Sequence, residues 1–244
     1  MIWLQWLTCA VVTVLVIVRL PAFVRGTNRL MFGLMAFLDL AVLLSIEAPY
    51  LAVDSLLGGR NVANLLLRFI IYGFALLLAI RVARAFAGYR AERALVGPWG
   101  LGFLAVCSGG LVLTFVMTNM TTSRVGFATD GLELWPAVYG TLGRVYPTFT
   151  GLAVMPALLA TAGRRGPVLL RTAAAALAAG YALLAVSNII TVLPNEATAF
   201  SQVINYGTIL LVCVGLTLVW ISSLNVRRRE RAVRATQSVK NPPS

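Results

Sequence analysis

The sequence predicts an all-α membrane protein of seven transmembrane helices, with its N-terminus outside the cell and its C-terminus in the cytoplasm. Apolar residues make up 59% of the 244 residues, charged residues make up only 11%, and the mean hydropathy is +0.88. A soluble domain carries about 25% charged residues, so this chain lacks the side chains to cover a surface in water. Apolar segments of about 20 residues, the length that crosses the hydrocarbon core as a helix, recur along the chain.

The apolar segments follow one another with short connections between them. They are expected near residues 2–19, 30–53, 62–86, 98–119, 134–160, 167–193 and 201–225. The first has no basic residue at its start and is closed by Arg19, so we interpret it as a retained helix and not as a signal peptide. Residues 1–225 then form one membrane domain, and residues 226–244 form a basic cytoplasmic tail that is expected to be disordered.

The distribution of arginine predicts the orientation. The connections after the first, third and fifth segments contain Arg19, Arg25, Arg29, Arg81, Arg84, Arg90, Arg93, Arg164, Arg165 and Arg171. The connections on the other side contain only Arg60 and Arg124, beside Asp54, Asp130, Glu133 and Glu196. Because arginine-rich loops stay in the cytoplasm, the first group and the basic tail define the inner side. Trp99 and Trp220 then fall at the inner interface, where indole rings are enriched.

Residue types that often carry catalysis are absent or rare in the sequence. It contains no histidine, which is the commonest general base and zinc ligand. Its one lysine, Lys240, lies in the tail, which excludes a retinal protein because such a protein holds its chromophore on a lysine inside a helix. Cys9, Cys107 and Cys213 lie in apolar stretches without metal-ligand spacing. We therefore expect no enzyme, no cofactor and no metal site.

The net charge of +12 does not indicate a nucleic-acid partner, because the arginines lie between apolar runs and do not form one soluble patch. The expected partner is the lipid bilayer. The tail sequence RRRERAVRATQSVK has three interpretations: it binds anionic lipid, it binds a cytoplasmic protein, or it serves only to fix the topology.

Four charged residues lie deeper in the apolar segments than the arginines assigned to the connections, at a level where a charge costs about 2.5–3.5 kcal/mol and usually faces the interior of the bundle. They are Asp39, Glu47, Arg68 and Arg144. Glu47 and Arg68 lie equally far from the outer ends of the second and third segments, so we expect them to form an ion pair. Its role is either to bind a solute or only to fix the packing of the two helices.

Polar residues recur at helical spacing in the outer half of several segments. They include Asn64, Asn188 and Asn205. With Arg68 and Arg144 they predict an outward-facing pocket in which Arg144 holds a small anionic or zwitterionic solute. Asp39 and Glu47 are the deep carboxylates available for coupling transport to an ion. The alternatives are hydrogen bonds between helices and, for Arg144, bonds to backbone carbonyls freed by Pro147.

Three stretches of the chain resemble an actinobacterial family of seven-helix integral membrane proteins described as candidate transporters. They are GGRNVANLLLRF at 58–69, WPAVYGTLGRVYP at 135–147 and GRRGPVLLRTAAAALAAGYALL at 163–184. The resemblance implies a fold and a location in the plasma membrane, and it implies no site residues. Members of that family often continue into a cytoplasmic domain, whereas this sequence stops after a short tail. Two functions remain open: a small-solute transporter, or a seven-helix receptor that signals through a cytoplasmic partner.

Overall fold

The computed structural model of the protein describes residues 2–26, 29–118, 134–190 and 198–240, and their regular structure is helical throughout. The helices are α1 (Ile2–Val24), α2 (Arg29–Leu43), α3 (Glu47–Leu56), α4 (Val62–Ala85), α5 (Tyr89–Val96), α6 (Pro98–Thr118), α7 (Leu134–Gly163), α8 (Val168–Ile190) and α9 (Thr198–Lys240). Six of them are long and apolar enough to cross a membrane, and there are seven such spans if α2 and α3 are taken as one broken span. The chain is therefore a polytopic helical membrane protein.

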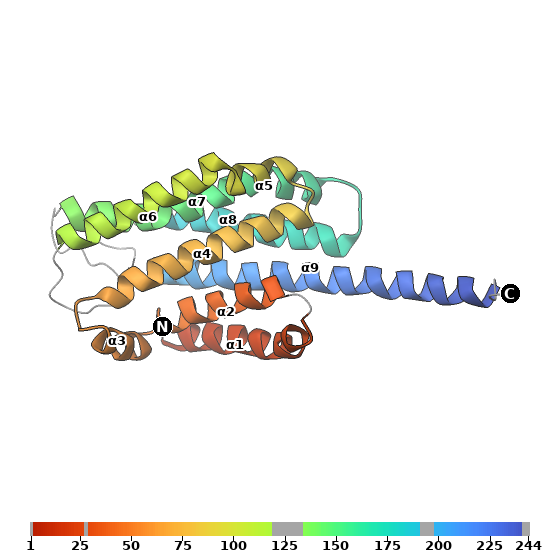
Figure 1. Ribbon diagram of the computed structural model, residues 1–244, viewed down its shortest axis with the longest axis horizontal. Helices are drawn as coiled ribbons and strands as arrows, with labels where there is room; N and C mark the ends of the chain where they lie inside the picture. Colours follow the sequence, from red (N-terminus) through yellow and green to blue (C-terminus); the bar gives the residue numbers. More distant parts are fainter. Residues whose placement is uncertain (1, 27–28, 119–133, 191–197, 241–244) are drawn as a thin grey trace.

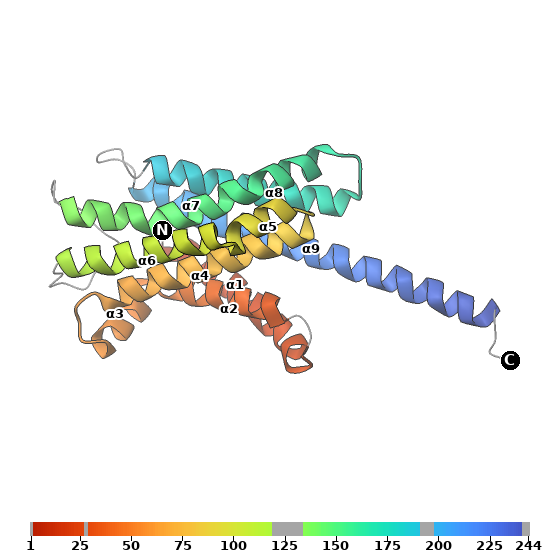
Figure 2. The ribbon, with the colours of Figure 1, turned by 45° about the horizontal axis from the view of Figure 1, so that its top comes forward.

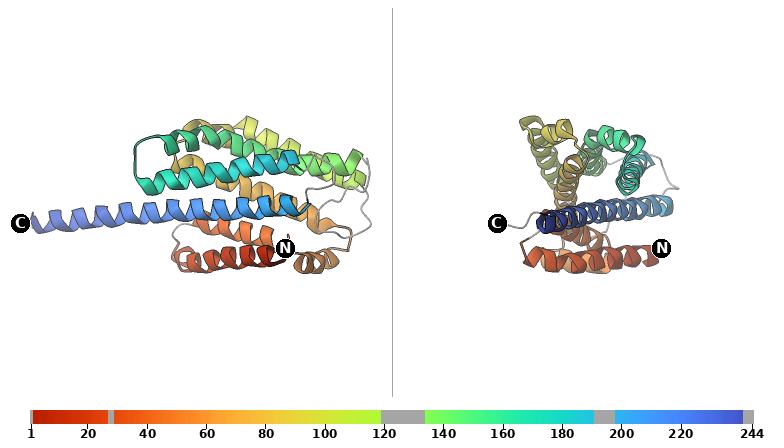
Figure 3. Two further views of the ribbon diagram at one scale, coloured as in Figure 1. Left: turned by 180° about the vertical axis from the view of Figure 1, so that it is seen from behind. Right: turned by 90° about the vertical axis from the view of Figure 1, so that its right-hand side faces the viewer.

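The helices lie roughly antiparallel in one bundle (Figure 1). α1 and α2 lie at one edge, α6 lies at the other, and α4 and α9 lie between them, as both Figure 1 and Figure 3 show. One end of the bundle, called here the arginine-rich end, carries the α1–α2 turn, α5 and the α7–α8 turn. α9 projects beyond the other helices at this end (Figure 2). The opposite end, called here the α3 end, carries α3 and the first turns of α4 and α7.

The second predicted helix is not continuous, so the single helix expected over 30–53 is wrong. α2 ends at Leu43 and α3 begins at Glu47, with a bend of 95° between them. Pro49 explains the break, because in a continuous helix its ring would clash with the carbonyl of Ser45 and no N–H would be available to bond it. In α3 the proline occupies the first turn, where no such bond is needed.

Three further boundaries differ from the prediction. α1 continues past Arg19 to Val24, and the connection after α4 contains an additional short helix, α5. α9 runs to Lys240, through the segment for which the sequence predicts a disordered tail. Arginine, alanine, glutamate and glutamine all have high helix propensity, which allows the apolar part of α9 to continue into this polar segment.

The core is made where small residues let the helices approach closely. Ala173 and Ala174 of α8 are fully buried, and a Cβ on Gly215 of α9 would lie only 2.5 Å from Cγ of Leu177. The alanine-rich start of α8 therefore serves packing, as small residues do between membrane helices. Large apolar side chains such as Val106 and Val116 of α6 point away from the bundle, which is the surface that a lipid bilayer covers.

Candidate functional site

The α3–α4 connection is held in place by a buried carboxylate. Asp54 of α3 is fully buried, and its Oδ1 and Oδ2 accept hydrogen bonds from the backbone N–H groups of Ala63 (2.9 Å) and Asn61 (3.0 Å). These are donors at the start of α4 that have no partner within the helix. Asn61 adopts a left-handed conformation with φ of 61°, and its side-chain oxygen accepts a hydrogen bond from the Tyr50 hydroxyl. This network fixes the beginning of α4 against α3.

Arg68 lies two turns into α4 and extends toward α7. Its guanidinium carbon is 5.6 Å from the centroid of the Tyr139 ring, close enough for a cation–π contact. The Tyr139 hydroxyl in turn donates a hydrogen bond of 3.1 Å to Oδ1 of Asn64. Asn64 and Arg68 are one helical turn apart, so Tyr139 contacts both residues on the same face of α4.

Gly143 makes room for the Arg68 side chain. A Cβ at this position would lie 2.8 Å from both Cδ and Cζ of Arg68 and closer still to one of its terminal nitrogens. One turn away on α4, the Tyr72 hydroxyl donates a hydrogen bond of 2.5 Å to the backbone carbonyl of Leu142. The Arg68 side chain therefore lies against the backbone of α7 and the Tyr139 ring.

Arg144 follows Gly143 in the chain, and its positive charge lies near that of Arg68. Both side chains are half-buried. In the described part of the chain neither of them forms an ion pair with a carboxylate. Arg68 of α4 therefore lies against the turn of α7 that also carries Arg144. We call Arg68 and Arg144 the arginine pair.

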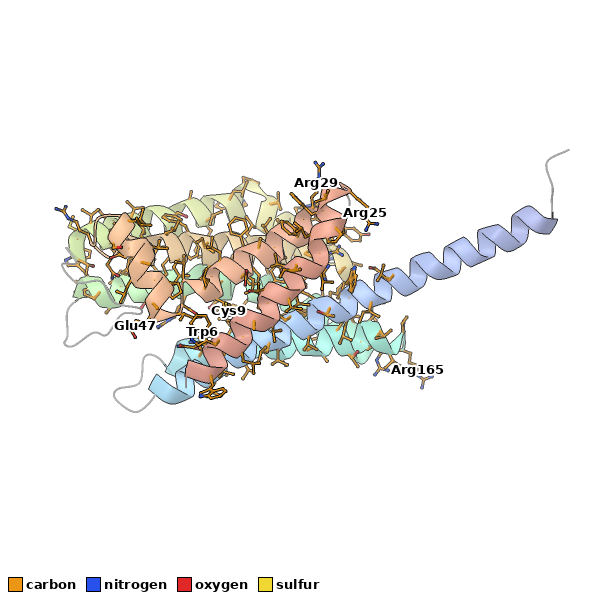
Figure 4. The ribbon with its side chains drawn as sticks, turned by 90° about the horizontal axis from the view of Figure 1, so that it is seen from below. Trp6, Cys9, Arg25, Arg29, Glu47 and Arg165 are labelled. Carbon is orange, nitrogen blue, oxygen red and sulfur yellow. The ribbon has the colours of Figure 1, made fainter. Side chains whose placement is uncertain are left out.

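The expected ion pair between Glu47 and Arg68 is wrong. Glu47 is exposed at the first turn of α3, and Figure 4 shows it away from the core of the bundle. The 95° bend turns α3 away from the axis of α2, so equal depth in the sequence does not bring the carboxylate to Arg68. Within the described residues the ion pair that does form is Arg84–Glu92, with Nε and Oε1 2.7 Å apart.

The other predicted site residues do not join the arginine pair. Asp39 of α2 accepts a hydrogen bond of 2.8 Å from the Thr13 hydroxyl and so links α2 to α1. Asn205 of α9 accepts one of 2.6 Å from Ser187 and links α9 to α8. Asn188 lies near the end of α8, and its side chain is outside the described part of the structure. Of the predicted residues, Asn64, Arg68 and Arg144 are the ones that the structure brings together.

Gly143 is a residue of this candidate site that the sequence analysis missed. A glycine in the middle of a helical segment is unfavourable by about 0.5–1 kcal/mol relative to alanine, and this one directly precedes a charged residue in an apolar run. A glycine in the middle of an apolar helix, followed at once by a charged residue, could therefore have predicted that another side chain packs over the helix at this point. The sequence analysis placed Asp54 in a connection, and the structure buries its side chain against the start of α4, where it accepts backbone hydrogen bonds.

Comparison of the chain with protein-family models, with curated proteins and with solved structures finds no match.

Proposed function

We propose that the protein is a small-solute transporter of a bacterial plasma membrane, and that an anionic or zwitterionic solute binds at the arginine pair. The observation that supports this most directly is that the Arg68 side chain extends from α4 over Gly143, against the turn of α7 that also carries Arg144. Two positive charges repel each other, and each is costly in a hydrocarbon surrounding. An anionic group bound between them would lower both costs.

The chemistry of the arginine pair favours a carboxylate. A guanidinium is planar, offers five donors and does not lose its proton, so two of them can hold both oxygens of one carboxylate. The Asn64 amide and the Tyr139 hydroxyl, bonded to each other beside Arg68, offer polar contacts for the rest of the solute.

The proposed orientation makes this site accessible from outside the cell. The arginine-rich end would lie in the cytoplasm by the positive-inside rule, and Figure 4 shows Arg25, Arg29 and Arg165 at this end. Arg68 lies about 9 Å along α4 from its start at the α3 end, at 1.5 Å per residue. Asp39, which accepts a hydrogen bond from Thr13 of α1, is the carboxylate that we propose to carry a coupled proton.

The test compares ligand-induced stabilisation of variants. The melting temperature of the purified protein is measured with acetate, lactate, phosphate, glycine and glutamate, with choline as the cationic control. We expect at least one anionic or zwitterionic compound to raise the melting temperature, and Arg144→Gln to weaken its binding by about tenfold or more, because a hydrogen bond to a charged group is lost. Arg60→Gln removes an exposed arginine at the same end and should bind as the wild type does.

Two further results complete this test. Arg144→Lys keeps the charge but loses the planar fork, so it should bind with intermediate affinity. If Arg144→Lys and Arg144→Gln both leave ligand stabilisation and uptake into proteoliposomes unchanged, the arginine pair is structural and the proposal fails.

The length of α9 favours a second candidate function, that of a receptor. α9 leaves the bundle and continues as a single helix to Lys240, a geometry that could present a surface to a cytoplasmic protein. Truncation after residue 225 distinguishes the two functions. A transporter should retain its uptake, whereas a receptor should keep ligand binding and lose its effect on the partner.

A further inference from the structure

A second cluster of arginine side chains lies at the arginine-rich end, where three helices meet. Arg19 of α1 is only 6% exposed, although the sequence places it in a connection. Its guanidinium carbon is 4.9 Å from the centroid of the Trp220 ring of α9, and the charge of Arg81 of α4 lies near enough to act on it. Arg19, Arg81 and Trp220 are called here the inner basic site.

The inner basic site lies at the depth of the lipid headgroups. α1 ends at Val24, α4 ends at Ala85 and the apolar part of α9 ends at Leu224. Each of the three residues is therefore within about one and a half helical turns of the end of its span, or roughly 8 Å along the helix axis. Arginine and tryptophan side chains are enriched at this level, where the hydrocarbon gives way to phosphates.

No carboxylate among the described residues forms an ion pair with Arg19. The acidic residue of α5 at this end, Glu92, is bonded to Arg84 at 2.7 Å. The stacking on Trp220 orients the plane of the Arg19 guanidinium but supplies no negative charge. A buried, oriented guanidinium beside a second arginine is a suitable site for an oxyanion.

We propose that Arg19 and Arg81 bind the phosphate of an anionic phospholipid at the arginine-rich end of the bundle. The surface of α1 next to Arg19 supports a lipid over a free phosphate, because Leu20 and Phe23, which lies one turn on from Arg19, are 46% and 39% exposed and can contact acyl chains. Basic pockets between helices on the cytoplasmic side of membrane proteins bind such headgroups. This lipid site is separate from the arginine pair, and either site can exist without the other.

The experiment is native mass spectrometry of the full chain in detergent, titrated with phosphatidylglycerol or with phosphatidylcholine of the same acyl chains. We expect the wild type to bind phosphatidylglycerol about tenfold more tightly than phosphatidylcholine. Arg19→Gln should reduce the affinity for phosphatidylglycerol by about tenfold, the effect of losing one charge-assisted hydrogen bond, and leave that for phosphatidylcholine unchanged. Arg29→Gln, which removes an exposed arginine at the same end, should have no effect.

Two measurements keep the proposal open to refutation if Arg19→Gln does not fold. Arg81→Gln alters the half-buried member of the site and should lower the affinity for phosphatidylglycerol in the same way. Inorganic phosphate added to the wild type should compete only weakly with the lipid. Equal binding of the two lipids, unchanged affinity in every folded variant of the site, or efficient competition by inorganic phosphate would each overturn the lipid site.

Discussion

Gly143 is the residue on which the position of the Arg68 side chain depends most directly. In Gly143→Ala the new methyl group would overlap Arg68 and force its side chain to move, which should cost about 1–3 kcal/mol of stability. The matched control is Gly140→Ala on the same helix, where a Cβ meets no atom within 4 Å. The control should be neutral or slightly stabilising, because alanine favours a helix. Thermal unfolding in detergent measures both, and equal melting temperatures would contradict the observed contact.

Asp54 provides a second test at the residue scale. Asp54→Ala removes the acceptor of two backbone N–H groups at the start of α4, and a buried unsatisfied donor costs about 1–3 kcal/mol. The control is Ser55→Ala, which removes an exposed hydroxyl bonded only to Ala52. We expect Asp54→Ala to lower the melting temperature and to raise hydrogen exchange at the first turn of α4. Slow exchange there in the variant would rule out the capping role.

The sequence identified the members of the arginine pair because a charge in an apolar run is conspicuous. Their partners were harder to predict, since equal depth in two helices says nothing about the direction in which the side chains point. Glu47 illustrates this, as it shares the depth of Arg68 and is nevertheless exposed. Asn64 lies on the same face of α4 as Arg68, and both residues contact Tyr139.

At the scale of elements, the apolar runs predicted most helices to within a few residues. The main error concerns the run at 30–53, which was predicted as one helix and is divided into α2 and α3. Residues 30–53 are almost uniformly apolar. Hydropathy is a mean over many residues, so a single proline such as Pro49 hardly changes it and the break is not detected. Pro147 and Pro156 lie inside α7 without ending it. A proline therefore marks a possible break, and the packing of neighbouring helices decides whether the helix continues.

The close contact between α8 and α9 depends on Gly215, and a substitution there tests how the two helices pack. Gly215→Ala would place a methyl group 2.5 Å from Cγ of Leu177, which should separate the helices and cost about 1–3 kcal/mol. Gly207→Ala, on the same helix with no neighbouring atom within 4 Å, should leave stability unchanged or raise it by up to about 1 kcal/mol. Chemical unfolding of the two variants separates a packing effect from helix propensity.

At the scale of the whole molecule, arginine counts predicted which connections share an end, and the arrangement in Figure 1 agrees with that grouping. The α1–α2 turn, α5 and the α7–α8 turn all lie at the arginine-rich end. Which end faces the cytoplasm depends on the membrane and not on the packing of the helices. The sequence rule predicts this orientation, and labelling can test it.

Single cysteines report the orientation in intact cells. Cys9, Cys107 and Cys213 are buried, so replacing them with alanine gives a background with no native thiol. Arg60→Cys and Arg90→Cys then introduce thiols at exposed positions at opposite ends. An impermeant thiol reagent should label the first and not the second. The reverse pattern would invert the proposed orientation and place the arginine pair toward the cytoplasm.

The break after α2 has a consequence for the membrane around the protein. α2 has 15 residues and is about 22 Å long, whereas the hydrocarbon core is about 30 Å thick. Such hydrophobic mismatch is relieved by local thinning of the bilayer, here beside the α3 end. Water and headgroups would then reach deeper next to α4 than elsewhere around the bundle. At about 9 Å from the start of α4, Arg68 would lie at a depth similar to this depression, which would shorten the path from water to the site that we propose for a solute.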